Sequence, residues 1–302
     1  MKKVLLAFSG LLLILQLNAQ TELLTLAENK LQGPVRSVAT NVNWLVEKFG
    51  EWETASVYWN ETAEFSKAGL LISSSKEESK FKTKNKFSYN KKNQLAQWKE
   101  VFGKEKEKEK QYVRKYVYDA NGRETELNFY GDDGELSWKE KKHYNEDGLL
   151  EEVFLYGGGG SLITHSVYTY NDSKRLQSVT AKNLKKETTR LSEYEYDGDG
   201  NRTGEETYDR NSNTKKTFVW VYENGVRVSE TKTTIGSNGK RTEQIGFNKD
   251  GHETSLSDLD NYNRRTVYTY DSHNNWVTAT FTFKNYEGKN AGYRMVREID
   301  YY

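Results

Sequence analysis

One segment of the chain has the residue types of a calcium-binding loop. Asp197-Gly-Asp199-Gly-Asn201 matches the first half of an EF-hand loop, in which alternating side-chain oxygens surround the ion. The sixth loop position, normally Gly, is Arg202, and the twelfth, normally Glu, is Tyr208. The segment is therefore better explained as an Asp- and Gly-rich turn than as a metal site.

Two other features resemble parts of known binding sites but lack the complete motif. Gly157 to Gly160 lacks the Gly-Lys-Ser/Thr that completes a phosphate-binding loop, so it is interpreted as a hairpin loop. The four histidines show no metal-ligand spacing, and the chain has no cysteine; these histidines are His143, His165, His252 and His273. We therefore predict no catalytic residue, no metal, no cofactor and no enzyme activity. A Ser–His–Asp site assembled across strands stays open.

The seven tryptophans are the remaining candidates for ligand contact, because indole rings can stack on sugars. Most are expected in the core, since aromatic side chains bury a large area each. Trp98 and Trp138 are the two we single out as candidate ligand-binding residues. Both are placed on the second strand of their repeats, away from the tyrosine-rich strand.

An internal repeat of about 26 residues indicates which elements carry these residues. Aromatic anchors recur along the chain, with four consecutive spacings of 26 residues. The anchors are Phe65, Tyr89, Tyr118, Tyr144, Tyr170, Tyr196, Tyr222, Phe247 and Tyr270. A second aromatic often stands two residues earlier, so one face of each strand is expected to be aromatic.

Each anchor is followed by residues that favour a tight turn. Gly, Asn or Lys stands four residues after most anchors, and three after Tyr222, where a positive φ would close a hairpin. These residues are Gly69, Asn93, Gly122, Gly148, Lys174, Gly200, Gly225, Gly251 and Asn274. A second turn lies about midway between anchors. Each repeat is therefore predicted to be one β-hairpin.

The predicted fold is all-β: an antiparallel meander of about twenty strands over residues 35–302. Because open sheets seldom exceed about ten strands without curling, we expect a curved sheet, an open shell or a barrel-like solenoid. Coiling would turn the aromatic face inward and leave the first and last strands as exposed edges. Residues 20–34 form a short segment that could be helical over Thr21–Leu31 and cover one edge.

The first 19 residues read as a secretory signal peptide. Lys2 and Lys3 precede an apolar run that is shorter than a membrane-spanning helix, and Leu17-Asn18-Ala19 suits cleavage. We expect an exported protein, in the periplasm, at the cell surface or secreted, with no transmembrane segment after cleavage. The strands lack the alternating apolar stripe of a membrane barrel.

Composition limits the partners. Basic and acidic residues nearly balance, giving a net charge of +1, so nothing favours nucleic acid. The chain has 21 tyrosines, 12 phenylalanines and 7 tryptophans, enough to build an aromatic core. We expect a monomer that binds a protein or carbohydrate partner.

The repeat resembles a known family. Tyr116-Val117-Tyr118-Asp119-Ala120-Asn121-Gly122-Arg123 is similar to the tyrosine–aspartate (YD) repeat of Rhs-like proteins, and Tyr196-Asp197-Gly198-Asp199-Gly200-Asn201-Arg202 is a second such copy. A weaker similarity is to MORN-like hairpin repeats. The resemblance implies hairpin repeats that wrap into a shell and have no enzyme activity of their own.

These observations predict an exported, non-enzymatic binding or surface-structural module for a glycan or protein partner. Two alternatives stay open: an immunity-like protein that guards against a secreted toxin, and a hydrolase of an envelope polymer. The hydrolase would need a cleft with convergent titratable groups, and the binding module an exposed aromatic or charged strip.

Overall fold

The computed structural model describes residues 25–104, 107–258, 263–284 and 288–302. The predicted signal peptide, residues 1–19, lies outside them. The strands are β1 (Val35–Lys48), β2 (Glu51–Phe65), β3 (Leu71–Glu78), β4 (Phe81–Tyr89), β5 (Leu95–Lys104), β6 (Lys110–Tyr118), β7 (Glu124–Tyr130), β8 (Leu136–Tyr144), β9 (Leu150–Gly157) and β10 (Leu162–Tyr170). They continue with β11 (Leu176–Lys182), β12 (Thr188–Tyr196), β13 (Arg202–Asp209), β14 (Thr214–Glu223), β15 (Val226–Gly236), β16 (Gly239–Phe247), β17 (Glu253–Asp258), β18 (Asn263–Tyr270), β19 (Trp276–Lys284) and β20 (Asn290–Tyr301).

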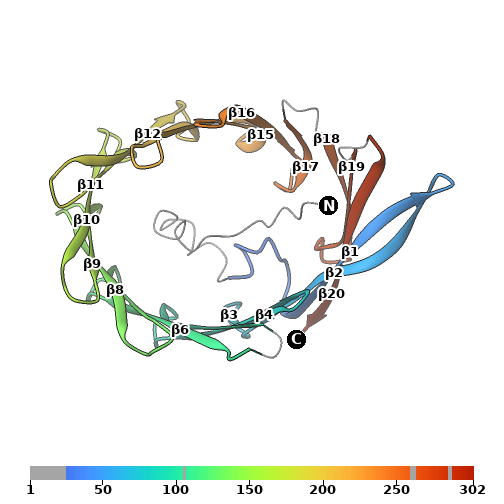
Figure 1. The fold of residues 1–302 in the computed structure, drawn as a ribbon, viewed down its shortest axis with the longest axis horizontal. Helices are drawn as coiled ribbons and strands as arrows, with labels where there is room; N and C mark the ends of the chain where they lie inside the picture. Colours follow the sequence, from blue (N-terminus) through green and yellow to red (C-terminus); the bar gives the residue numbers. More distant parts are fainter. Residues whose placement is uncertain (1–24, 105–106, 259–262, 285–287) are drawn as a thin grey trace.

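The sheet closes into a barrel. Every strand pairs antiparallel with the next one along the chain, and β1 pairs with β20 from Val35–Tyr301 to Val46–Ala291. Figure 1 shows the result as an elongated ring. The all-β meander is confirmed. The expected exposed edges are wrong, because first and last strands satisfy each other's backbone groups.

The aromatic face is the inner face of the ring. The described segment before β1 lies inside the ring, and its Leu31 packs with Phe65, Leu71 and Phe87. On the opposite, outer face, Val117 is exposed to 46%. Lys115, Lys141 and Glu193 are exposed there too, where a membrane barrel would present apolar side chains.

A capped turn replaces the expected N-terminal helix. Thr25 and Glu28 bond reciprocally, Glu28 N donating to Thr25 Oγ1 at 3.2 Å and Thr25 N to Glu28 Oε2 at 2.7 Å, as in a capping box. The turn does not continue as a helix, and residues 21–24 lie outside the described part of the chain. Instead of covering an edge, it bridges the barrel mouth: Leu26 N donates to Gly69 O, and Lys30 Nζ to Gly251 O.

The turns beside the tyrosines follow the sequence prediction closely. All nine predicted turn residues have positive φ, including Lys174 at 58°, a value unusual for a residue with a side chain. An Asp or Asn follows seven of the nine anchors and bonds its own turn: Asp119 Oδ1 accepts from Arg123 N at 2.9 Å, and Asp197 Oδ1 from Asn201 N at 2.8 Å.

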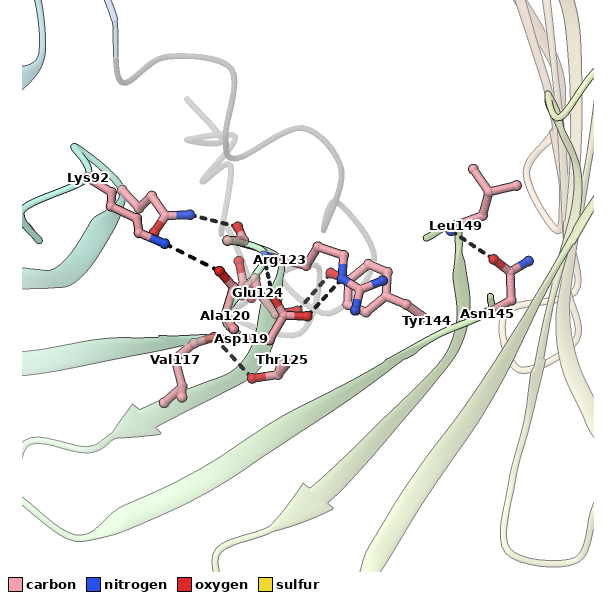
Figure 2. Close-up of polar contacts among 12 residues, drawn as sticks. Lys92, Val117, Asp119, Ala120, Arg123, Glu124, Thr125, Tyr144, Asn145 and Leu149 are labelled. Atoms are coloured by element: carbon pink, nitrogen blue, oxygen red, sulfur yellow. Dashed lines mark hydrogen bonds and ion pairs between the residues drawn. The ribbon is translucent and has the colours of Figure 1, made fainter. Parts of the chain in front are cut away.

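Five anchor tyrosines join the end of their strand to the start of the strand before it. The phenol of Tyr144 donates to Glu124 O at 2.7 Å, and Tyr170 to Leu150 O at 2.7 Å (Figure 2 shows Tyr144). Tyr89, Tyr118 and Tyr196 make the same bond to Leu71, Leu95 and Leu176. The rings are only partly buried, less than the expected burial of the aromatic face.

This bond gives a testable consequence at Tyr170. Tyr170→Phe should lower the free energy of unfolding by about 1 kcal/mol, because the carbonyl of Leu150 loses its donor. Tyr170→Ala should cost more, about 2–4 kcal/mol, since part of the ring packing is also lost. Urea unfolding of both variants measures this. Thr169→Ala, on the exposed face of the same strand, is the control and should stay within about 0.5 kcal/mol; an equal loss there would contradict the assignment of faces.

Candidate functional site

Trp98 and Trp138 lie in one row across the inner wall. The strand register aligns Phe87, Trp98, Arg114, Phe129 and Trp138 as direct neighbours on β4 to β8. Trp138 therefore lies on the strand that ends at Tyr144 and on the same face. Its expected position on a second strand, away from the tyrosine-rich strand, is wrong. The register also places Trp98 on that face, opposite Phe87.

The row is a continuous stack. The Arg114 guanidinium lies 4.0 Å from the centre of the Trp98 ring and 5.0 Å from that of Phe129. Phe129 stacks on Trp138 at 5.0 Å with an interplanar angle of 12°. Arg114 is 4% exposed and pairs with Glu100 at 3.2 Å, so its charge is compensated within the wall.

Trp98 is held by neighbouring side chains on both sides, whereas Trp138 is held on one side only. Trp98 Nε1 donates to Asn85 Oδ1 at 2.9 Å, and its ring lies between Phe87 and Arg114. Trp138 ends the row, because the next position on β9 is Gly157, which has no side chain. Ligand contact by either tryptophan stays a prediction.

Glu140 is a buried acid beside this row. It lies on β8 between Leu127 and Leu155, is 2% exposed, and its Oε2 has no hydrogen-bond partner among the described residues. Burial raises the pKa of its carboxyl to about 7, although nearby Lys142 opposes the shift. Because the carboxyl is shielded from solvent, its raised pKa makes the stability of the fold depend on pH.

The other sequence candidates are structural. Asp197–Asn201 forms the turn between β12 and β13, and Gly157–Gly160 the turn between β9 and β10. His143 and His165 lie on the outer face against Phe154 and share Glu152. His252 contacts the hydroxyl of Tyr270, and His273 stacks on Tyr301. Within the described residues, no three His, Asp or Glu side chains are placed to hold a metal.

A cleft of about 510 Å³ lies on the outer face of the same sector, behind the aromatic row. It is lined by Gln97, Lys99, Gln111, Val113, Lys115, Tyr130, Gly131, Asp132, Asp133 and Gly134. Strands β5 and β6 supply the amides and ammonium groups, and the β7–β8 turn supplies the carboxylates. Sequence reasoning missed it, because these polar residues look like any solvated strand face; the Gly131–Gly134 turn was the only signal.

The cleft offers both donors and acceptors around one ring. Lys115 Nζ lies 4.8 Å from the centre of the Tyr130 ring. Asp133 Oδ1 accepts from Glu135 N at 2.9 Å, which fixes the turn that forms one side. Two lysines and two aspartates give the lining no net charge, so it suits a neutral polar ligand better than an ion.

The fold and site define a closed barrel of β-hairpin repeats with a polar outer cleft. No helix in the described part of the chain is long and apolar enough to cross a membrane. No family model and no curated protein matches the sequence.

Among solved structures, the chain is similar to a porin-like protein from Bacteroides uniformis at 9% identity and TM-score 0.40, over 89% of this chain and 98% of that one. A porin-like protein from Bacteroides vulgatus has 12% identity, TM-score 0.27 and the same coverages. The Tc holotoxin pore of Photorhabdus luminescens has 11% identity and TM-score 0.26, and this chain spans 17% of that chain. Similarities this low carry no inference about the fold or the function of this chain.

The raised pKa of Glu140 predicts how stability depends on pH. Its ordinary value is 4.5, so between pH 4.5 and 7 the folded state holds more protons than the unfolded chain, and stability falls as pH rises. Glutamine at this position does not titrate, so the free energy of unfolding of Glu140→Gln should not fall in this way. Its difference from that of the natural chain should shift in favour of the variant by up to about 3 kcal/mol from pH 5 to pH 8. Urea unfolding at the two pH values measures it. The exposed Glu151→Gln is the control; a matching gain there would remove the cause assigned to burial.

Proposed function

We propose that this protein is an exported, non-enzymatic barrel that binds a neutral glycan in the cleft of β5, β6 and the β7–β8 turn. The observation that carries the proposal is the chemistry of that lining. Sugar hydroxyls both donate and accept hydrogen bonds. The amides of Gln97 and Gln111 do the same, while Lys99 donates and Asp132 accepts.

The backing of the cleft supports binding because it is rigid. Trp98, Arg114 and Phe129 stack directly behind it on the inner face of the same strands. A site held by packed neighbours loses less conformational entropy when a ligand binds. In this proposal the YD-like repeats form the scaffold, and the cleft is the binding site that this scaffold carries.

The test is a titration of the mature chain with neutral oligosaccharides, in which calorimetry measures the binding. Gln111→Ala should weaken binding about tenfold, because an exposed amide in the cleft is lost without a change in the core. Gln244→Ala is the matched control, since Gln244 is an exposed glutamine on the outer face of β16, outside the cleft.

Two outcomes would contradict the proposal that the glycan binds in the outer cleft. One is no binding of any neutral oligosaccharide. The other is binding that Gln111→Ala leaves unchanged and Trp138→Phe weakens, which would move the ligand to the inner wall.

The proposed export rests on Lys2, Lys3 and the apolar run that follows. The mature protein should begin at or next to Gln20. N-terminal sequencing of the exported fraction measures this. Recovery of intact Met1 from a membrane pellet would contradict it.

A further inference from the structure

The β1–β2 hairpin extends beyond the barrel wall. Figure 1 shows it projecting from the ring. On one side, β1 stays paired with β20 as far as Val46. On the other side, β2 pairs with β3 only from Trp59 onward. The backbone of Glu51–Tyr58 therefore has an outer edge with no strand beside it in the described residues.

The tip of this hairpin carries a residue that local backbone preference disfavours. Phe49 and Gly50 form the two-residue turn with φ of 54° and 87°, and Phe49 is fully exposed at 106%. The β14–β15 hairpin makes the same kind of turn with Asn224 and Gly225, at 52° and 76°. Asn-Gly is the preferred pair for this turn, whereas a bulky residue with positive φ is strained. An exposed phenylalanine there gains nothing for the fold, which points to a contact outside the chain.

The chemistry of the edge indicates what it would contact. Glu51 and Glu53 are its two charged residues, and Val57 is exposed to 62%. Glu53 already pairs with Lys48 of β1 at 2.7 Å, whereas Glu47 and Glu51 leave the tip of the hairpin acidic overall. Acidic groups next to a membrane would be repelled by anionic lipid, and opposed copies of this edge would bring together segments of equal negative charge. An extended strand with lysine or arginine at alternate positions satisfies both the open backbone edge and the carboxylate of Glu51.

We propose that Glu51–Tyr58 is a docking edge for an extended, basic polypeptide segment of another protein, which adds a strand to β2 while Phe49 packs against it. The inference is independent of the glycan cleft, which lies on β5 to β7. It also explains why the hairpin is longer than the wall requires.

The experiment uses the full mature chain and a synthetic peptide of alternating lysine and valine. Hydrogen exchange should slow at the amides of Glu51–Tyr58 when the peptide is added. Phe49→Asn should weaken peptide binding about tenfold or more, because the phenyl contact is lost. The barrel should stay folded, because the variant has the same Asn-Gly turn as Asn224 and Gly225. Glu51→Lys should weaken binding of the basic peptide and strengthen binding of a matching peptide of alternating glutamate and valine. Asn224→Ala, in the equivalent turn of another hairpin, should leave binding unchanged.

The proposal would be overturned by peptide binding without slower exchange at Glu51–Tyr58, or by full binding to Phe49→Asn. Dimers of the peptide-free chain that protect this same edge would assign it to a second copy instead. Binding of the chain to neutral lipid vesicles that depends on Phe49 would assign the tip to a membrane.

Discussion

One contact recurs at five of the repeats: a strand-ending tyrosine donates its hydroxyl to the carbonyl where the preceding strand begins. The contact needs a turn of fixed length, because the phenol and the carbonyl meet only if the hairpin register is unchanged. Between Tyr144 and Glu124 that turn is the one joining β7 and β8, where Gly134 has a positive φ and Asp133 Oδ1 accepts from Glu135 N. Burial raises the pKa of Tyr118 to about 12, so its hydroxyl remains a donor throughout the physiological range.

Closure follows from repeating this unit. Twenty strands at about 4.8 Å spacing would form a ribbon near 95 Å wide, which cannot stay flat with an aromatic face in water. Curvature places that face on the concave side, where arginine guanidiniums such as that of Arg114 fill the gaps between rings. The seam is strengthened by the apolar cluster around Val35 and Phe65, which also includes Ile299 and Tyr301, so the first and last strands support each other.

The local parts of this fold could be predicted from the sequence, because they depend on neighbours along the chain. The repeat, the strand start at Val35 and the turn residues such as Lys174 all follow from spacing and backbone preference. Closure could not be predicted, since it depends on whether curvature summed over twenty strands brings β1 to β20. The placement of Trp138 failed for a related reason: its face is set by counting back from Tyr144 within one strand, not by its distance from the tyrosine-rich motif.

The division of the sheet into two faces explains where function can reside. The inner face is committed to holding the barrel, as Trp98 shows: its ring and its nitrogen are both occupied by wall neighbours. Residues of the outer face and of the projecting hairpin have few such duties, so they can vary in chemistry without loss of the fold. A departure from local preference at these positions is therefore more informative than an aromatic residue in the wall. Phe49 is such a departure because an asparagine at the same turn position of β14–β15 shows what the fold alone would accept.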